Sequence, residues 1–181
     1  VRRAADFLVE FRYPDTKLPL PSWDVWEERR GTHIWTTAAV CAALSSASHY
    51  AAYISDIAAA DRFQTACDEV RDAISKYFWN EDEASFARML TVDETGKLKQ
   101  DMTADSSVIA LFALGVFPPD DARLRATMQV VGRKLWVKAG VGGLARYEKD
   151  YYFRVSDDFA KVPGNPWIIC TLWLADWYIA T

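Results

Sequence analysis

The stretch PWIICTLWLADWYIA, residues 166–180, decides the fold. It is apolar almost all the way round a helix, and Asp176 is its one charged residue. Asn165 before it is a favourable N-cap, and Pro166 suits the first helical position. The sequence therefore predicts a helix that opens at Asn165 and runs through Ala180.

A helix without a polar face must be surrounded by other helices in a globular protein. We therefore expect this one to be an inner helix, with Ile169, Leu172 and Trp173 almost wholly buried. The other predicted helices carry a single apolar stripe each, as helices of an outer layer do. Alternating buried and amphipathic helices fit a toroid of helical hairpins, in which an inner ring lies within an outer ring. Six hairpins close such a toroid, and this chain supplies about half of them.

Apolar residues at helical spacing predict the remaining helices. These lie at residues 2–12, 33–53, 61–78 and 105–114, and a further one is opened by Pro118-Pro119-Asp120. The segment 79–98, with a DETGK turn at 93–97, predicts an extended hairpin on the rim. The fold class is therefore all-α, with one short β-like hairpin.

Charge and hydropathy exclude two classes of partner. The 181 residues carry a net charge of −4, and the pI is near 5.2. A nucleic-acid partner would need a basic face, so none is expected. The longest apolar runs are far shorter than a membrane span, so no membrane partner is expected either.

The three cysteines are odd in number and widely spaced, and each lies in a predicted helix among apolar neighbours. Cys41, Cys67 and Cys170 are thus expected to be buried free thiols. This usage is typical of a reducing compartment and predicts a cytoplasmic location. His33 and His49 lack any arrangement that would mark a catalytic triad or a metal site, and both are interpreted as structural.

Two separate clusters point to carbohydrate chemistry. The first is PSWDVWEERRG, residues 21–31, in which a Glu27–Glu28 pair directly follows a tryptophan. Such chemistry uses an acid to protonate a glycosidic oxygen, with aromatic and hydrogen-bonding groups to hold the sugar. Paired glutamates are common on solvated surfaces, so the second cluster matters. It is GGLARYEKDYYF at 142–153, followed by GNPW at 164–167.

Together the clusters resemble the glucoamylase-like glycoside hydrolases, the family of glucoamylases, glucodextranases and some trehalases. In that family, a D-L-W-E-E-R-x-G segment carries the general acid as its first Glu. A later R-Y-x-E/K-D-x-Y-Y segment runs into G-N-P-W at the start of a barrel helix. The matching residues are Asp24, Trp26, Glu27, Glu28 and Gly31, then Arg146, Tyr147, Asp150, Tyr151 and Tyr152, then Gly164, Asn165, Pro166 and Trp167.

The resemblance extends from about residue 18 to the end of the chain. Val25 stands where the family usually has Leu, and RVSDDFAKVP is inserted between Phe153 and Gly164. The resemblance implies that residues 1–181 are part of a catalytic α/α six-hairpin barrel, about half of it. We expect the chain to be truncated at both ends.

By the same resemblance, Glu27 is the general acid. It must be protonated near neutral pH, which burial and a nearby negative charge favour. Trp23, Trp26 and Glu28 are expected to supply these conditions. Glu28 is then expected to accept hydrogen bonds from sugar hydroxyls.

The other expected binding residues each have a competing structural interpretation. Arg146 suits charge-assisted hydrogen bonds to sugar hydroxyls, and it also suits an ion pair with Asp150, four residues on. Asp24 could bind substrate or hold a turn. Trp26 and Trp167 are expected to wall the pocket, and Trp167 would equally serve as an anchor at the helix start. We expect the two clusters to converge at one end of the helices.

These residues predict an oligosaccharide substrate, no cofactor and no metal. The predicted reaction is the hydrolysis of terminal α-linked glucose by an inverting general acid/base mechanism. The second carboxylate that this mechanism needs has no convincing match in the chain. We therefore expect the base to lie beyond residue 181 and this chain alone to be inactive. The alternative is a non-catalytic helical carbohydrate-binding or structural module.

Overall fold

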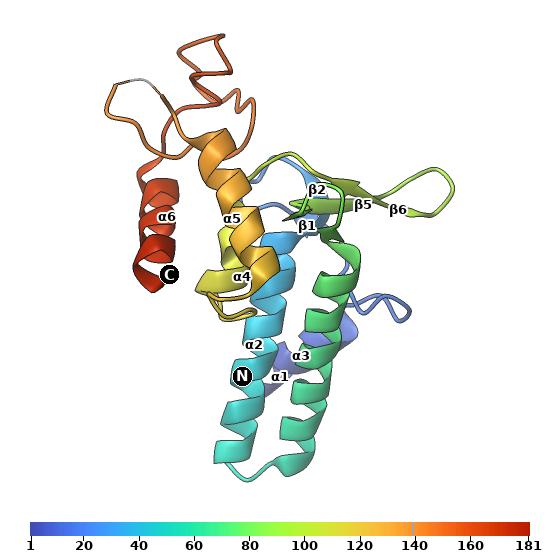
Figure 1. The fold of residues 1–181 in the computed structure, drawn as a ribbon. Helices are drawn as coiled ribbons and strands as arrows, with labels where there is room; N and C mark the ends of the chain where they lie inside the picture. The colour runs from blue at the N-terminus through green and yellow to red at the C-terminus, as the bar shows by residue number, and fades with distance from the viewer. Residues whose placement is uncertain (139) are drawn as a thin grey trace.

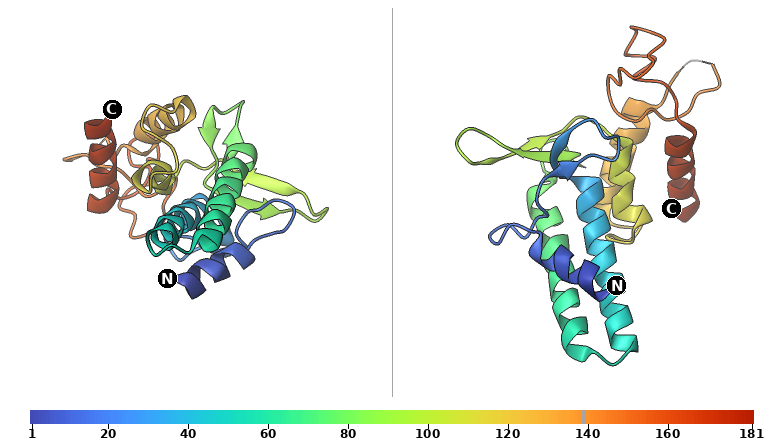
Figure 2. Two further views of the ribbon diagram at one scale, coloured as in Figure 1. Left: turned by 90° about the horizontal axis from the view of Figure 1, so that it is seen from below. Right: turned by 180° about the vertical axis from the view of Figure 1, so that it is seen from behind.

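A computed structural model describes residues 1–138 and 140–181. Helices dominate it, and two short sheets lie at one end (Figure 1, Figure 2). The helices are α1 (Arg2–Glu10), α2 (Ile34–Tyr53), α3 (Ile57–Tyr77), η1 (Ser106–Ile109), α4 (Ala110–Ala113), α5 (Ala122–Leu135) and α6 (Ile168–Ala180). The strands are β1 (Ser22–Trp23), β2 (Arg30–His33), β3 (Trp79–Asn80), β4 (Ser85–Phe86), β5 (Met89–Val92) and β6 (Leu98–Asp101). The expected fold class, a part of an α/α barrel with a small β element, is confirmed.

The long antiparallel hairpin of α2 and α3 is the main helical contact (Figure 1). Small side chains of α2 such as Ala38 and Ala47 are buried. Larger residues complete the core between them, notably Leu44, Phe63 and Val70, all buried. The α3 helix begins before the predicted residue 61, because the Asp56 carboxylate accepts a hydrogen bond from a first-turn N–H.

The four-stranded antiparallel sheet has the order β1-β2-β5-β6. The segment 79–98, predicted as one hairpin, instead contributes to two, β3–β4 and β5–β6. The turn between β5 and β6 lies at the predicted DETGK, where the Asp93 carboxylate accepts hydrogen bonds from Thr95 and Lys97. The strands β1 and β2 lie within the 21–33 segment and were not predicted. They hold the first cluster between two paired strands, since Ser22 pairs with Gly31 and Trp23 with Arg30.

The predicted start of the last helix is wrong by two residues. Trp167 is the N-cap of α6, and its extended backbone precedes the first helical turn. The Asn165 amide instead donates to the carbonyls of Tyr152 and Phe153, so it ties the inserted loop to the chain before α6. Pro166 lies in an isolated bridge with Ala145.

The predicted burial of α6 is also wrong. Only one face of the helix packs on the core, through Cys170, Leu174 and Trp177. Ile169 is 47% exposed and Leu172 is 55% exposed. Trp173 is partly buried, with its ring centroid 5.0 Å from that of Trp35 and 6.2 Å from that of Trp26.

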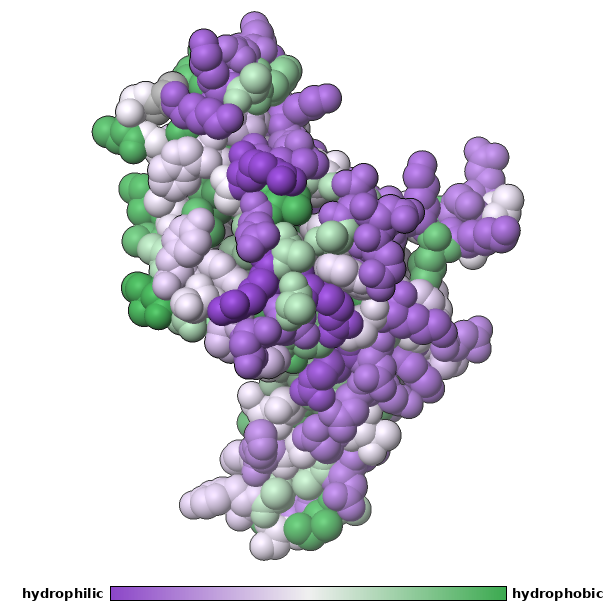
Figure 3. Space-filling view, in the orientation of Figure 1, coloured by the Kyte–Doolittle hydropathy of each residue, from purple (hydrophilic) through white to green (hydrophobic). Residues whose placement is uncertain are grey.

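The exposed side of α6 is a second apolar surface. Figure 3 shows hydrophobic residues along the left edge of the molecule, where α6 lies. The exposed residues are Ile168, Ile169, Leu172, Tyr178 and Ile179. The sequence indicated an apolar helix correctly, but the described residues 1–138 and 140–181 supply packing partners for only one face of it.

Two further expectations concern cysteines and membranes. All three cysteines are buried and free, as predicted. In the part of the chain that the structure describes, no helix combines the length and the apolarity needed to cross a bilayer.

Candidate active site

The first cluster forms a tight turn between β1 and β2. Asp24 holds it: its carboxylate accepts the backbone N–H of Glu28 at 2.7 Å and that of Arg29 at 3.3 Å. The Asp24 carbonyl accepts the N–H of Glu27 at 3.0 Å. The turn role of Asp24 is therefore present, and its expected contact with substrate stays a prediction.

Glu27 has a left-handed backbone, with φ of 59°. Non-glycine residues rarely adopt this conformation, and where they do the strain often accompanies a functional site. The expected burial of Glu27 is wrong. Its side chain is exposed, and Trp23, expected to shield it, is 60% exposed.

The two clusters meet at Glu28 and Arg146, although 118 residues separate them. An Nη2 group of Arg146 donates to Glu28 at 2.9 Å. The second oxygen of Glu28 accepts hydrogen bonds from the Tyr147 hydroxyl and, at 3.0 Å, from Arg29. The expected convergence of the clusters is thus confirmed for Glu28 and Arg146.

Arg146 is fixed from the other side by Asp150. Two N–H groups of the guanidinium donate to the two Asp150 oxygens, both at 2.7 Å, and Asp150 is wholly buried. Burial works against the charge on Arg146, but the hydrogen bonds and charges of Asp150 and Glu28 outweigh it and raise its pKa. Arg146 is therefore a permanently charged, rigidly oriented donor, and its predicted ion pair with Asp150 is confirmed.

Aromatic rings surround this guanidinium. Its central carbon lies 5.4 Å from the ring centroid of Trp26 and 4.9 Å from that of Trp167. Tyr147 and Tyr152 are similarly close, at 5.2 and 5.0 Å. Trp26 and Trp167 therefore flank Arg146, as the expected pocket walls would. The helix-start role of Trp167 is also present, since it is the N-cap of α6.

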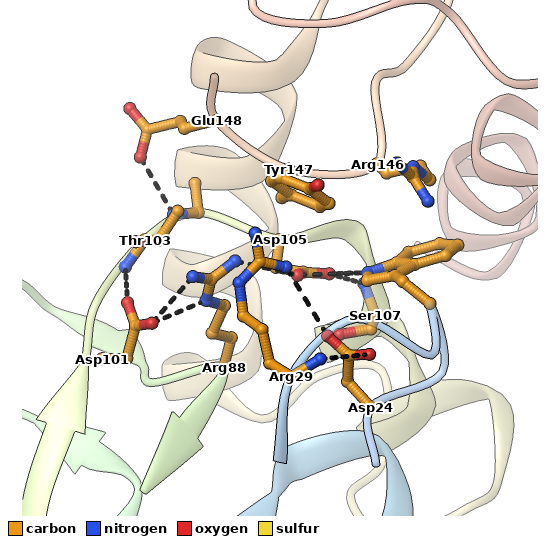
Figure 4. Close-up of polar contacts among 12 residues, drawn as sticks. Asp24, Arg29, Arg88, Asp101, Thr103, Asp105, Ser107, Arg146, Tyr147 and Glu148 are labelled. Carbon is orange, nitrogen blue, oxygen red and sulfur yellow. Dashed lines mark hydrogen bonds and ion pairs between the residues drawn. The ribbon is translucent and has the colours of Figure 1, made fainter. Parts of the chain in front are cut away.

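Asp105 links Trp26 to a network of charged side chains that includes Arg88 and Asp101 (Figure 4). The indole N–H of Trp26 donates to both Asp105 oxygens, at 3.1 and 3.2 Å. Asp105 also accepts the N–H of Ser107 at 2.8 Å and lies 3.6 Å from Arg88. Burial raises the pKa of Asp105, and these contacts oppose that effect. Arg88 in turn donates twice to Asp101, at 2.9 and 2.8 Å.

Sequence reasoning missed Asp105 and Arg29 as members of the site. Arg29 lies within the quoted motif, and its guanidinium carbon is 4.5 Å from the Tyr147 ring centroid. The step from two acidic to two basic residues in EERR is the signal that could have indicated it. Nothing in the sequence connects Asp105 to Trp26.

The two histidines lie outside the cluster of acidic and aromatic side chains. His33 is buried at the end of β2, and burial lowers its pKa. Its carbonyl accepts the Thr37 hydroxyl at 2.7 Å. His49 is exposed in α2. Neither position contradicts the structural interpretation.

An apolar cavity of about 430 Å³ lies next to the site, between α6 and the loop before it. Trp167 contributes to its wall together with Trp136, Pro166, Thr171 and Leu172. Glu28 and Arg146 do not line it. Trp167 therefore borders both this cavity and the Arg146 guanidinium.

The partial α/α barrel brings Glu28 of the first cluster to Arg146 of the second, beside Trp26 and Trp167. The class of protein that this fold and site indicate is a glycosidase. The chain belongs to Glycosyl hydrolases family 15, because the family model matches residues 10–181. An uncharacterized glycosyl hydrolase of Methanocaldococcus jannaschii is 30% identical over 159 residues, which is 87% of this chain. The chain spans only 23% of that relative's length.

Two solved structures show the same fold. A bacterial glucoamylase complexed with acarbose has a TM-score of 0.75 and 22% identity, covering 97% of this chain and 28% of its own. A wild-type glycosidase has a TM-score of 0.69 and 23% identity, covering 98% of this chain and 40% of its own. At these identities the likeness concerns the fold alone. It agrees with a chain that forms part of a larger barrel.

Proposed function

We propose that this chain is the acid-bearing part of a glycoside hydrolase that releases terminal α-linked glucose with inversion. The observation that carries the proposal is the ion pair between Glu28 and Arg146. It joins the two carbohydrate-type motifs across 118 residues of sequence, next to the Trp26 and Trp167 rings. Family membership and the acarbose bound to a neighbour of the same fold support a carbohydrate ligand.

The charges of the cluster suit a neutral polyhydroxyl ligand. The rigid Arg146 donor and the Glu28 acceptor offer directed hydrogen bonds to sugar hydroxyls. Indole faces, such as those of Trp26 and Trp167, pack against the C–H faces of pyranoses. Glu28 is 12% exposed at its side chain, and Arg146 is 5% exposed. A ligand would therefore meet the edge of a preorganised network.

Glu27 is the general acid of this proposal. Its exposed carboxyl is open to an incoming glycosidic oxygen, and an incoming sugar would supply the shielding that the isolated turn lacks. Protonation of the leaving oxygen contributes on the order of 10²–10⁴-fold to such a reaction. The left-handed backbone of Glu27 is strained, and such strain is often found at catalytic residues.

The general base must be a second carboxylate, about 6.5–9.5 Å from the acid. By charge alone, four acidic residues of this chain can be considered for the role of general base: Asp105, Asp157, Asp158 and Asp176. Asp105 is buried and already bonded to Trp26 and Ser107, so it does not suit the role. Asp157 pairs with Arg154 in the exposed inserted loop. We place the base in a longer parent chain, and expect the 181-residue chain alone to turn over no substrate.

The test compares glucose release from maltooligosaccharides, isomaltose and trehalose by this chain and by a longer parent. The parent is expected to be active. In the parent, Glu27→Gln keeps the shape of the side chain but removes the acidic proton. It should therefore retain ligand binding and lose most of its turnover. The matched control is Glu83→Gln, which changes an exposed glutamate in the β3–β4 turn and should leave turnover intact.

Three outcomes would contradict parts of this proposal. Undiminished turnover by the Glu27→Gln parent would remove Glu27 from the mechanism. Turnover by the 181-residue chain would place the base within it. Sugar binding without turnover in every parent chain would favour the alternative, a non-catalytic carbohydrate-binding module.

A further inference from the structure

A pair of cysteines lies in the α2–α3 interface, away from the candidate active site. The sulfur of Cys41 in α2 is 3.4 Å from that of Cys67 in α3. The Cys41 thiol also lies 3.6 Å from the Cys67 carbonyl, which accepts from it. Both residues are buried. Two thiols in such close contact are placed for reaction with each other.

One charged residue touches the pair. An Nη2 group of Arg71 lies 3.5 Å from the Cys67 sulfur, and it comes from the next turn of the same helix. A neighbouring guanidinium stabilises a thiolate, which is the reactive form of cysteine. The hydrogen bond with Cys41 lowers the pKa of Cys67, and Arg71 acts in the same direction. The same hydrogen bond raises the pKa of Cys41.

A cavity between α2, Arg71 of α3 and the segment after α4 has Cys41 in its wall. It has a volume of about 280 Å³. Cys41 and Arg71 both line it, together with Ser45, His49 and Gly115. His49 is exposed, so the cavity is continuous with the molecular surface. A molecule as small as a hydroperoxide fits such a space, where Cys41 is the thiol of the pair that lines the wall, and Cys67 lies directly behind it at 3.4 Å.

We propose that Cys41 and Cys67 form a peroxide-reactive dithiol, which hydrogen peroxide converts to a disulfide between α2 and α3. One sulfur, as the thiolate, attacks a peroxide oxygen. The O–O bond breaks, a sulfenic acid forms, and the hydroxide that leaves takes up a proton as water. The second sulfur then attacks the first, its proton is lost, and the S–O bond breaks to release a second water. Two thiols and one peroxide thus give one disulfide and two waters.

Forming this disulfide requires only a small movement of the two sulfurs. A disulfide has an S–S length of about 2.05 Å, so the sulfurs must approach by roughly 1.4 Å. The cross-link would join two helices at positions 26 residues apart. It would therefore constrain the unfolded chain and stabilise the hairpin.

The experiment treats the 181-residue chain with hydrogen peroxide and counts free thiols after denaturation. We expect the count to fall from three to one, with loss of two hydrogens from the intact mass. Non-reducing peptide mapping should find Cys41 linked to Cys67. The melting temperature should rise by roughly 5–10 °C and return to its first value on reduction.

Four variants sharpen the test. Cys170→Ser is the matched control, since Cys170 is buried but bonded to Ser106 rather than to another thiol, and it should leave the cross-link intact. Cys41→Ser and Cys67→Ser should each abolish it. Arg71→Met should slow its formation by about tenfold if Arg71 holds the thiolate pKa down by one unit.

Retention of three thiols would overturn the proposal, as would oxygen addition without a cross-link. A disulfide that includes Cys170, or one between two chains, would overturn it too. The wild-type chain alone decides these outcomes, so the test holds even if a serine variant fails to fold. None of these readouts depends on glycosidase activity.

Discussion

The indole N–H of Trp26 points at the Asp105 carboxylate, 3.1 Å from one oxygen and 3.2 Å from the other, across 79 residues of sequence. This contact fixes the plane of the indole whose face lies near Arg146. The same carboxylate lies 3.6 Å from the Nη1 group of Arg88. In the described part of the chain, this buried Nη1 group has no hydrogen-bond partner.

Asp105→Ala should therefore be strongly destabilising. It removes the acceptor of the Trp26 indole and leaves the Arg88 charge less compensated, which costs about 3 kcal/mol or more. Asp105→Asn keeps an acceptor oxygen of similar size and should lose clearly less. Urea unfolding at pH 7, followed by circular dichroism, measures both. Equal losses for the two variants would show that the indole contact contributes nothing.

Asp121 is the N-cap of α5, where its carboxylate accepts the N–H groups of Arg123 and Leu124 at 2.9 and 3.0 Å. Burial works against its charge, but these hydrogen bonds and the Arg123 charge outweigh it and lower its pKa. The stabilisation is then fully present above the ordinary value of about 3.8 and is lost as pH falls through the lower folded value.

Asp121→Ala should cost about 1 kcal/mol of unfolding free energy at pH 7. The charge-dependent part of that difference should disappear in strong acid. The neighbouring Asp120→Ala, which changes an exposed carboxylate, is the control and should change stability little. Denaturant titrations at pH 7 and pH about 2.5 make the comparison. If Asp121→Ala cost more unfolding free energy in acid than at pH 7, the lowered pKa of Asp121 would be contradicted.

Gly164 leaves no room for a side chain behind Asp150. A Cβ there would lie 2.6 Å from the Asp150 Cβ and 3.3 Å from the Ala145 Cβ. Gly164→Ala should push Asp150 from Arg146 and lower the melting temperature by about 5 °C or more. Gly132→Ala is the control, because its Cβ would meet only the Tyr178 hydroxyl, at 3.5 Å, in a helix where Ala is preferred. A Gly164→Ala chain that melts like wild type would refute this steric account.

The exposed apolar face of α6 should make the isolated chain self-associate. Ile168 is 81% exposed, and Ile169, Leu172, Tyr178 and Ile179 extend the surface. Such contiguous apolar patches promote association in water. Light scattering coupled to gel filtration should show species larger than a monomer, and Leu172→Ser with Ile169→Ser should reduce them. Ile54→Ser, at the far end of α2, should not. A monomer at every concentration would contradict this expectation.

The sequence predicted the features that depend only on neighbouring residues within one helix or one turn. The single stripes of α3 and α5 and the turn at Asp93 all follow from local periodicity and turn chemistry. The strands β1 and β2 escaped prediction because two and four residues are too short to show alternation. Tertiary structure also overruled local preference at Asn165, whose amide bonds the inserted loop instead of capping α6.

The candidate site was predictable only where motifs carried it. Glu28, Arg146 and Trp26 come together as the two clusters indicated. The exposure of Glu27 and the half-covered state of α6 depend on which other segments are present, and one helix's pattern cannot show that. The Trp26–Asp105 contact joins distant segments with no shared motif, so only three-dimensional structure shows it.

The long sequence separations within the site have a consequence for the order of folding. The contacts of Glu28 with Arg146 and Tyr147 close loops of 118 and 119 residues, whereas the Ser48–Ala60 contact between α2 and α3 closes a loop of 12 residues. Closing a long loop costs more chain entropy and slows the formation of the contact. The hairpin should therefore form early and the Glu28–Arg146 contact last. Refolding would then restore helicity before it restores the aromatic environment of Trp26, so the two signals should separate in time.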